Sequence, residues 1–401
     1  MNGLPLQGLR VADFSQGIAG PYCAMLLGDL GAEVIKLEPP RGDWIRVLGR
    51  KVEGNNSPLY IAMNRNKKSL CLEMKHPEGL AMAREVVAKS QIIVESFRPG
   101  VMGRFGLDYH TVHAAQPDLV YVSITGFGPE GPYVELPGSD SVLQAMGGIM
   151  ALNGEGGGEP LRVGMFMVDL LTGMTGYQGA LAALLARGVA HPGGGLGQLV
   201  ETSLLDAIVA FQAPLLAEYR MYGLEPERNG NVNSFVAPSG VFKTRDGYIL
   251  MTALNHQWEK CCQALERPDL LREERFASNE SRLAHREALL EILRPILTGR
   301  TTAEWLERFR AGDLLCAPIN MYPDLVADPQ VAVNDLLCET PHPVLGNLPG
   351  VRNPVRFSGM KLPTAPPPML GEHSRLVASE LLGRTTAQVD ALIGEGVLIA
   401  G

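Results

Sequence analysis

The sequence predicts an α/β protein built around a parallel sheet, and three observations support this prediction. Apolar runs of strand length alternate with helical patterns through the first half of the chain. Glycine or proline marks most of the boundaries between them, where a chain turns. At 401 residues the chain is also too long for one ordinary core, so we expect two domains. Alternation of this kind is typical of parallel strands joined by crossover helices.

The expected strands of the sheet are short runs rich in valine, isoleucine and leucine. They cover Leu9–Phe14, Glu33–Glu38, Ser69–Met74, Gln91–Glu95, Leu119–Thr125 and Gln198–Thr202. The expected helices are one that ends at Leu30 before Gly31, then Pro77–Ser90, Leu170–Arg187 and Ser203–Tyr222. A glycine-rich turn, His191–Gly197, is expected before the last strand.

The composition changes after this last helix. Residues 226–233 are rich in asparagine, glycine and proline and are typical of a linker. Beyond them we expect a smaller α+β unit, with strands Val241–Lys243 and Tyr248–Thr252 and helical sequence through Arg310. After Asp328 the chain becomes proline-rich and ends in one more expected helix. We therefore divide the chain into residues 1–225, 226–328 and 329–401.

Charge and cysteine content narrow the class of protein. The net charge of −8 argues against nucleic acid as a partner, yet residues 1–105 hold 14 Lys and Arg against 10 Asp and Glu. A basic first quarter in an acidic protein favours a small anionic ligand. The six cysteines lack C-x-x-C spacing and no apolar run reaches transmembrane length, so we expect reduced thiols, no membrane and a cytoplasmic location.

Two common cofactor classes are not expected. Gly126–Gly131 matches the G-x-G-x-x-G pattern of dinucleotide sites, which must open a helix that binds the pyrophosphate. Pro129, Pro132 and Pro137 crowd that position, so we predict a turn and no NAD. The eight histidines form no pattern of metal-ligand spacing, so we expect no metal either.

The stretch Arg162–Asp169 ends an apolar segment and leads into a helix with Gly173, Gly176 and Gly179 on one face. Small residues at this spacing let another backbone pack closely. An aspartate at such a junction is an ordinary N-cap residue. It is also a possible nucleophile, kept ionised by the helix N-terminus. Asp140 is a second carboxylate in similar glycine-rich, apolar surroundings.

An ordered set of short stretches resembles the class III coenzyme A transferases, the family of formyl-CoA transferase and carnitine CoA-transferase. The matching segments are Gly8–Ser15 with Ala19–Pro21, Gly31–Glu38, Gly42–Asp43, Asn64–Ser69, Lys75–Gly79, Val94–Gly100, the Asp169 segment and Leu370–His373. They span nearly the whole chain in the order of the family.

The resemblance implies that Asp169 is the nucleophile that attacks an acyl-CoA thioester. A mixed anhydride and then an aspartyl-CoA thioester would carry CoA to a second carboxylic acid. The family pattern also brings a loop and several binding residues near the substrate. The loop residues are Gln16, Gly17 and Ile18, with Asp140 nearby. The expected CoA-binding residues are Leu72, Ser96 and Phe97 at the adenine and Arg104 at a phosphate, with Arg41, Arg46 and Arg98 added for their charge and position.

The resemblance further implies a Rossmann-like large domain formed by both chain ends, with the smaller α+β domain inserted. Members of the family form interlocked homodimers, so we expect one here. No nucleic acid partner is implied.

Two departures from the family pattern bear on the substrate. Formyl-CoA transferases carry glutamine where Ile18 stands, which argues against formate or oxalate. The related α-methylacyl-CoA racemases show Gly-His-Asp where this chain has Gly138–Asp140, and Ser139 cannot replace the histidine as a base. A racemase or epimerase and a non-catalytic CoA-binding protein are the alternatives. Arg46, Arg65 and Arg162 could pair with the distal carboxylate of a dicarboxylic acid such as succinate.

Overall fold

The computed structural model describes residues 3–50, 52, 56–189 and 195–401, and the chain divides into two compact units. The larger takes Met1–Ile149, Arg162–Tyr222 and Val333–Gly401, and the smaller takes Met150–Leu161 and Gly223–Ala332. The sequence did not assign Met150–Leu161 to the smaller unit. Its place there rests on long-range bonds, in which the Gly230 N–H donates to the Gly154 carbonyl and Arg228 donates to the Gly158 carbonyl.

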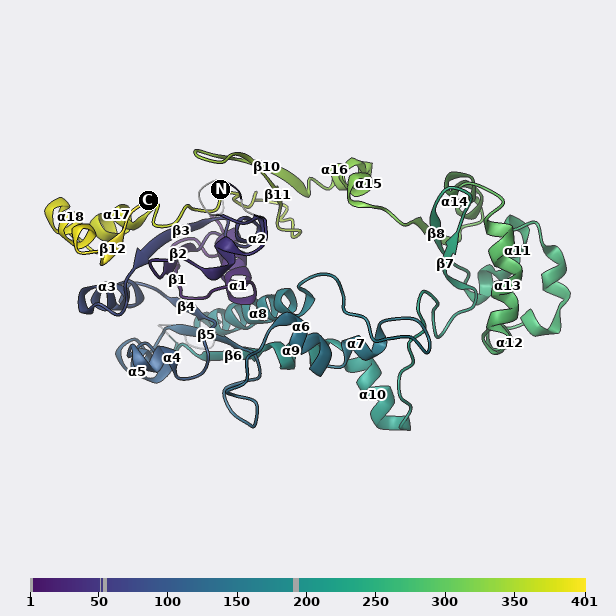
Figure 1. The fold of residues 1–401 in the computed structure, drawn as a ribbon, viewed down its shortest axis with the longest axis horizontal. Coiled ribbons are helices and arrows are strands. Elements are labelled where there is room, and N and C mark those ends of the chain that lie inside the picture. Colours follow the sequence, from purple (N-terminus) through teal and green to yellow (C-terminus); the bar gives the residue numbers. More distant parts are fainter. Residues whose placement is uncertain (1–2, 51, 53–55, 190–194) are drawn as a thin grey trace. The chain divides into compact units, whose positions relative to one another are not determined.

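The larger unit is built on a seven-stranded sheet in the order β12-β3-β2-β1-β4-β5-β6 (Figure 1). Six strands run parallel, and the short edge strand β12 runs antiparallel to β3. The strands are β1 Arg10–Asp13, β2 Glu33–Glu38, β3 Lys67–Leu72, β4 Ile92–Glu95, β5 Val120–Thr125, β6 Leu199–Ser203 and β12 Leu398–Ile399. The parallel α/β sheet predicted from the sequence is thus confirmed.

Helices cover both faces of this sheet, because successive side chains of a buried parallel strand point to opposite sides. On β1, Val11 packs on the face covered by α1 Ala19–Asp29 and α8 Met167–Val189. The next residue, Ala12, packs on the other face. That face is covered by α3 Pro77–Ala88, α4 Val101–Arg104, α5 Tyr109–Ala115 and α18 Thr386–Gly394.

Other helices of the larger unit surround the carboxyl edge of the sheet or extend from it. They are the 3₁₀ helix η1 Trp44–Val47, then α2 Pro58–Met63, α6 Asp140–Met146, α9 Leu204–Phe211, α10 Ala213–Tyr222 and α17 Ser374–Leu376. The single helix predicted over Ser203–Tyr222 is wrong in one respect, because it is divided at Gln212. Pro214 stands in the first turn of the second helix, where its missing N–H costs least.

The proline-rich region also contains strands that the sequence did not reveal. Leu337–His342 (β10) and Gly346–Val351 (β11) form an antiparallel hairpin. Strand β12 escaped prediction because it has two residues and pairs with β3, more than 300 positions earlier in the chain. The predicted turn at His191–Gly197 lies largely outside the described residues.

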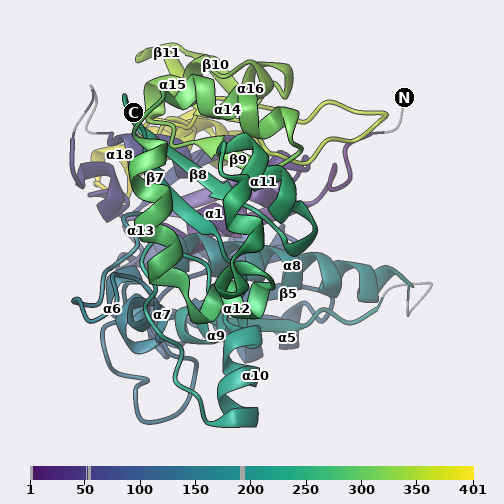
Figure 2. The same cartoon turned by 90° about the vertical axis from the view of Figure 1, so that its right-hand side faces the viewer.

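The smaller unit is an antiparallel sheet covered by helices (Figure 2). Its strands are β7 Ser239–Lys243, β8 Tyr248–Thr252 and β9 Leu315–Pro318, and its main helices are α11 Trp258–Ala264, α12 Asn279–Ala284, α13 Arg286–Leu297, α14 Thr302–Ala311, α15 Tyr322–Ala327 and α16 Pro329–Val333. Trp305 and Phe309 of α14 are fully buried in its core. Among the described residues, no helix of either unit combines the length and apolar composition needed to cross a membrane.

The glycines of α8 lie at close contacts, as their spacing predicted, with Gly173 against α1 and with Gly176 and Gly179 against the sheet. A Cβ atom on Gly173 would lie 2.5 Å from the Ala19 carbonyl oxygen, which is backbone and cannot move aside. A Cβ on Gly176 would lie 3.1 Å from Ile124 of β5. The contact between Gly173 and Ala19 brings the starts of α1 and α8 together at the edge of the sheet.

We expect Gly173→Ala to destabilise the larger unit by about 1–3 kcal/mol, because overpacking of a rigid contact forces the two helices apart. Gly188→Ala on the same helix is the matched control, since nothing lies within 4 Å of its Cβ position. There the better helix propensity of alanine should leave stability equal or raise it by about 0.5–1 kcal/mol. Urea unfolding of the two variants measures the difference, and equal effects would contradict the close-packing account.

Candidate active site

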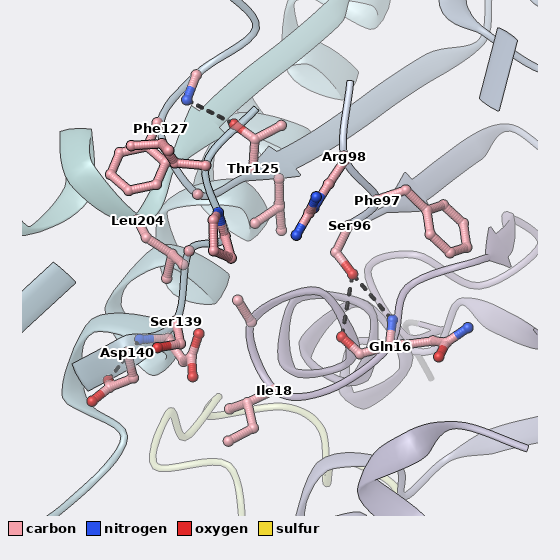
Figure 3. A pocket seen from close by; sticks show the side chains of 18 of the residues that line it. Gln16, Ile18, Ser96, Phe97, Arg98, Thr125, Phe127, Ser139, Asp140 and Leu204 are labelled. Carbon is pink, nitrogen blue, oxygen red and sulfur yellow. Dashed lines mark hydrogen bonds between the residues drawn. The ribbon is translucent and has the colours of Figure 1, made fainter. Parts of the chain in front are cut away.

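A cavity of about 340 Å³ opens at the carboxyl ends of β1, β4 and β5 (Figure 3). Open parallel sheets commonly bind ligands at this edge. Its lining residues come from the segments that follow these strands and from the starts of α1, α6 and α8. Predicted site residues among them are Gln16, Ile18, Ser96, Phe97, Arg98, Asp140 and Asp169.

Asp169 is the third residue of α8 and lies in its first turn, so the N-cap interpretation of this residue is wrong. The role of the cap belongs to Asp140, which is 29 positions earlier in the chain. Its Oδ2 accepts hydrogen bonds from the backbone N–H of Val168 at 2.8 Å and of Asp169 at 3.3 Å. A carboxylate satisfies these N–H groups and complements the positive end of the helix dipole.

Asp140 is itself held by Gln144, one turn further along α6. The Gln144 amide donates to Asp140 Oδ1 at 2.7 Å, and its Oε1 accepts from the Val163 N–H at 2.9 Å. Both side chains are buried. Together they attach the segment before α8 to α6, which fixes the position of Asp169. Sequence reasoning missed Gln144, although its i, i+4 spacing from Asp140 was a signal for this pair.

The Asp169 carboxyl is a weaker acid than an exposed aspartate, so the expectation that the helix N-terminus keeps it ionised is wrong. Burial is the larger cause, because removal from water disfavours the charged form, and the negative charge of Asp140 adds to it. The two raise the pKa of Asp169 from 3.8 to about 7. Such a carboxylate is more basic, and therefore more nucleophilic, than one in water.

The loop around Gln16 is held on both sides. The Ser96 hydroxyl accepts the Gln16 N–H at 3.0 Å and donates to the Gln16 carbonyl at 3.2 Å. Gly17 donates its N–H to Asp43 at 3.0 Å, and Asp43 forms a fully buried ion pair with Lys36 at 2.9 Å. Gly17 has a φ of 81°, and a Cβ there would lie 2.6 Å from Trp44. The loop is therefore rigid, and the Gly17 N–H is bonded to Asp43.

A second cavity, of about 250 Å³, adjoins the first. Leu72 lines it, and Gln16 and Phe97 line both cavities. Arg41 and Lys75 supply positive charge. Arg104, at the end of α4, is exposed and borders neither cavity, so its contact with a phosphate stays a prediction.

The arginines considered for a distal carboxylate fall into different environments. Arg46 is buried and its guanidinium bonds to Glu38 and Tyr60. Arg65 is paired with Asp29 at 2.9 Å. These internal partners occupy both side chains. Arg162 is exposed and donates to the hydroxyl of Ser141, which lines the first cavity.

Residues 6–374 match the model of CoA-transferase family III. The chain belongs to CoA-transferase family III. It is 35% identical to succinyl-CoA:glutarate CoA-transferase of Homo sapiens, over 99% of this chain and 91% of that protein. It is 34% identical to succinate–glutarate CoA-transferase of Agrobacterium fabrum, over 94% of this chain and 96% of that protein. The crystal structure of a CAIB/BAIF family protein from Brucella suis superposes with a TM-score of 0.86 at 34% identity, over 95% of this chain and all of that one.

Gln16 and Phe97 line both cavities, so an extended ligand would pass these two residues on its way from one cavity to the other. The turn at Gly126–Gly131 fits the same site. No helix begins between Gly126 and Ser139, as the prolines predicted, and Gly126, Phe127 and Gly128 line the first cavity.

We expect Asp169→Asn to stabilise the protein increasingly as pH rises from about 4 to about 7. The native carboxyl holds its proton up to about pH 7, whereas the unfolded one releases it near 3.8, so the wild type loses stability across this window. The asparagine has no such penalty. The gain should reach roughly 2–4 kcal/mol above pH 7.

Urea unfolding at pH 5 and pH 8 measures this gain. Glu95, whose pKa burial also raises to about 7, is present in both proteins and cancels from the comparison. A difference that does not change with pH would show that Asp169 titrates normally.

Proposed function

We propose that this protein is an acyl-CoA:carboxylate CoA-transferase with Asp169 as its nucleophile and dicarboxylic acids as its substrates. The observation that carries the proposal is a partly buried aspartate with a raised pKa, fixed by Asp140 in a cavity that adjoins a second one lined in part by Arg41 and Lys75. The names of the human and Agrobacterium relatives support succinate or glutarate as the acids.

The reaction balances through two kinds of intermediate. An Asp169 oxygen attacks the thioester carbonyl and CoA leaves as the thiolate, which gives a mixed anhydride. The thiolate then attacks the Asp169 carbonyl carbon, which releases the first acid and forms an aspartyl-CoA thioester. The second acid attacks that carbon to form a new anhydride and the thiolate. The thiolate finally attacks the acyl carbon, so the new acyl-CoA leaves and Asp169 is restored. Each step exchanges one activated acyl group for another.

The two cavities bind the two ends of CoA in this proposal. We place the adenine at Leu72 and Phe97 in the second cavity, with Arg41 and Lys75 near the phosphates. The pantetheine then passes Gln16, and the thioester reaches Asp169 in the first cavity. The rigid Gln16–Ile18 loop limits the position of the thioester carbonyl.

We also propose the assembly of the family, an interlocked homodimer with the smaller unit as an inserted domain. The exposed apolar side chains of α10 support it, since Met221 is 71% and Tyr222 67% exposed. A cytoplasmic location suits the six free cysteines. At the position where related racemases carry a histidine, Ser139 borders the cavity, which supports transfer over racemisation.

Hydroxylamine trapping tests the nucleophile. After mixing with succinyl-CoA, we expect the label on Asp169, because anhydrides and thioesters both yield hydroxamates. Asp169→Ala should give no adduct and lose at least about 10³-fold in kcat. Glu95 is the internal control, because it is a second buried carboxyl with a pKa raised to about 7. It should carry no label in the wild type. Peptide mapping that finds a label on Glu95, or none with any acyl-CoA, would contradict the proposal.

The pH dependence of the first chemical step tests the environment of the nucleophile. We expect the single-turnover rate of succinate release from succinyl-CoA to rise about tenfold per pH unit and to level off near pH 7, where Asp169 ionises. Asp140→Asn removes the nearby negative charge, so the midpoint should move to lower pH. Burial remains, so it should stay above 3.8. A rate independent of pH between 5 and 8 would exclude this account.

A further inference from the structure

Arg98 is the only cationic side chain among the described residues that line the cavity of Asp169. It lies three positions after the end of β4, in a segment whose backbone is fixed. The Phe97 N–H donates to Glu95 at 2.8 Å, and the Arg98 carbonyl accepts from Val101. Figure 3 shows its guanidinium between Ser96 and Thr125, directed into the cavity.

The guanidinium of Arg98 forms no ion pair or hydrogen bond within the described part of the chain. Arg98 also borders a smaller cavity that contains Glu95, Asp108 and Glu201, and none of these carboxylates pairs with it. Arg46 and Arg65 differ, because both are neutralised by internal carboxylates. An arginine with five free donors is suited to bind a carboxylate with two parallel hydrogen bonds.

The charges of the cavity would orient a dicarboxylic acid in one direction. Asp140 and Asp169 lie at the starts of α6 and α8 and repel a second carboxylate, whereas Arg98 lies after β4 and attracts it. Phe127, Val134 and Leu204 add apolar surface for methylene groups. This arrangement places the reacting end at Asp169 and the other carboxylate at Arg98.

The phosphates of CoA have other cations available. Arg41 and Lys75 line the adjoining cavity, where the adenine end is placed, and Arg98 does not line it. The guanidinium of Arg98 is therefore available to bind the acyl group of the thioester or the free acid.

We propose that Arg98 binds the distal carboxylate of the dicarboxylic acid and of its CoA thioester, and so selects diacids over monoacids. This inference rests on the proposed CoA-transferase function. It differs from the assignment of Arg98 to CoA itself that the sequence suggested.

The test compares glutarate with pentanoate, a monoacid of the same chain length, as acceptors from one fixed donor. In a ping-pong reaction, kcat/KM for the acceptor excludes the donor step, so the ratio of the two acids reports acceptor recognition alone. We expect Arg98→Gln to lower the glutarate/pentanoate ratio by about 10- to 100-fold, the effect of a lost charged hydrogen-bonded pair. Arg98→Lys should restore part of it, because it keeps the charge without the planar fork.

The matched control is Arg41→Gln, which removes a cation from the adjoining cavity. It should weaken binding of free CoA, measured by calorimetry, and leave the ratio of the two acids unchanged. Arg98→Gln should leave the affinity for free CoA within about twofold. Thermal melting shows that both variants are folded.

The outcomes separate this inference from the function on which it rests. An Arg98→Gln enzyme that loses affinity for free CoA and slows equally with both acids would show that Arg98 binds phosphate, while transfer itself stands. A wild type that does not distinguish glutarate from pentanoate would overturn both the dicarboxylate substrate and the role of Arg98. A wild type without transfer from any acyl-CoA would overturn the proposed function first.

Discussion

The close contact between α1 and α8 is the constraint on which the site depends. Gly173 lets the two helices approach until a methyl group would not fit beside the Ala19 carbonyl. Their first turns therefore meet at the carboxyl edge of the sheet, where the Gln16–Ile18 loop and Asp169 line one cavity. A larger residue at position 173 would change the distance between the nucleophile and the loop that faces it. Gly173 is thus part of the active-site geometry, although it does not line the cavity.

Buried ion pairs fix the position of the Gln16–Ile18 loop, which also lines the cavity. Lys36 with Asp43, Lys67 with Asp13 and Arg46 with Glu38 form ion pairs that are almost completely inaccessible to solvent. Such pairs contribute little to stability, because desolvation offsets most of their attraction. Their value here is positional. The Lys36 ammonium also donates to the Ser15 carbonyl, and Asp43 accepts the Gly17 N–H, so one ion pair holds the loop and the residue before it.

Local patterns in the sequence predict the regular core well and its long-range parts poorly. Glu33–Glu38 and Tyr248–Thr252 are strands with the predicted bounds, since their apolar composition and flanking turns are sufficient signals. Strand β12 and the segment Met150–Leu161 are positioned by residues distant in the chain, so no local pattern could reveal them. The same holds for Asp169. An aspartate at the start of a helix suggested an N-cap, but the cap is Asp140, and only the fold brings the two residues together.

The electrostatics of the cavity explain why a free arginine belongs in it. Burial beside Asp140 makes Asp169 basic enough to attack a thioester, and it also makes the cavity unfavourable for any further negative charge. A dicarboxylic acid brings two such charges. One is used in bond formation, but the second would have to be desolvated near two carboxylates without compensation. A monoacid would not meet this cost, so a cavity with only Asp140 and Asp169 would select against diacids. An unpaired guanidinium in the turn after β4 reverses that preference, and Arg98 is the one described lining residue that can supply it.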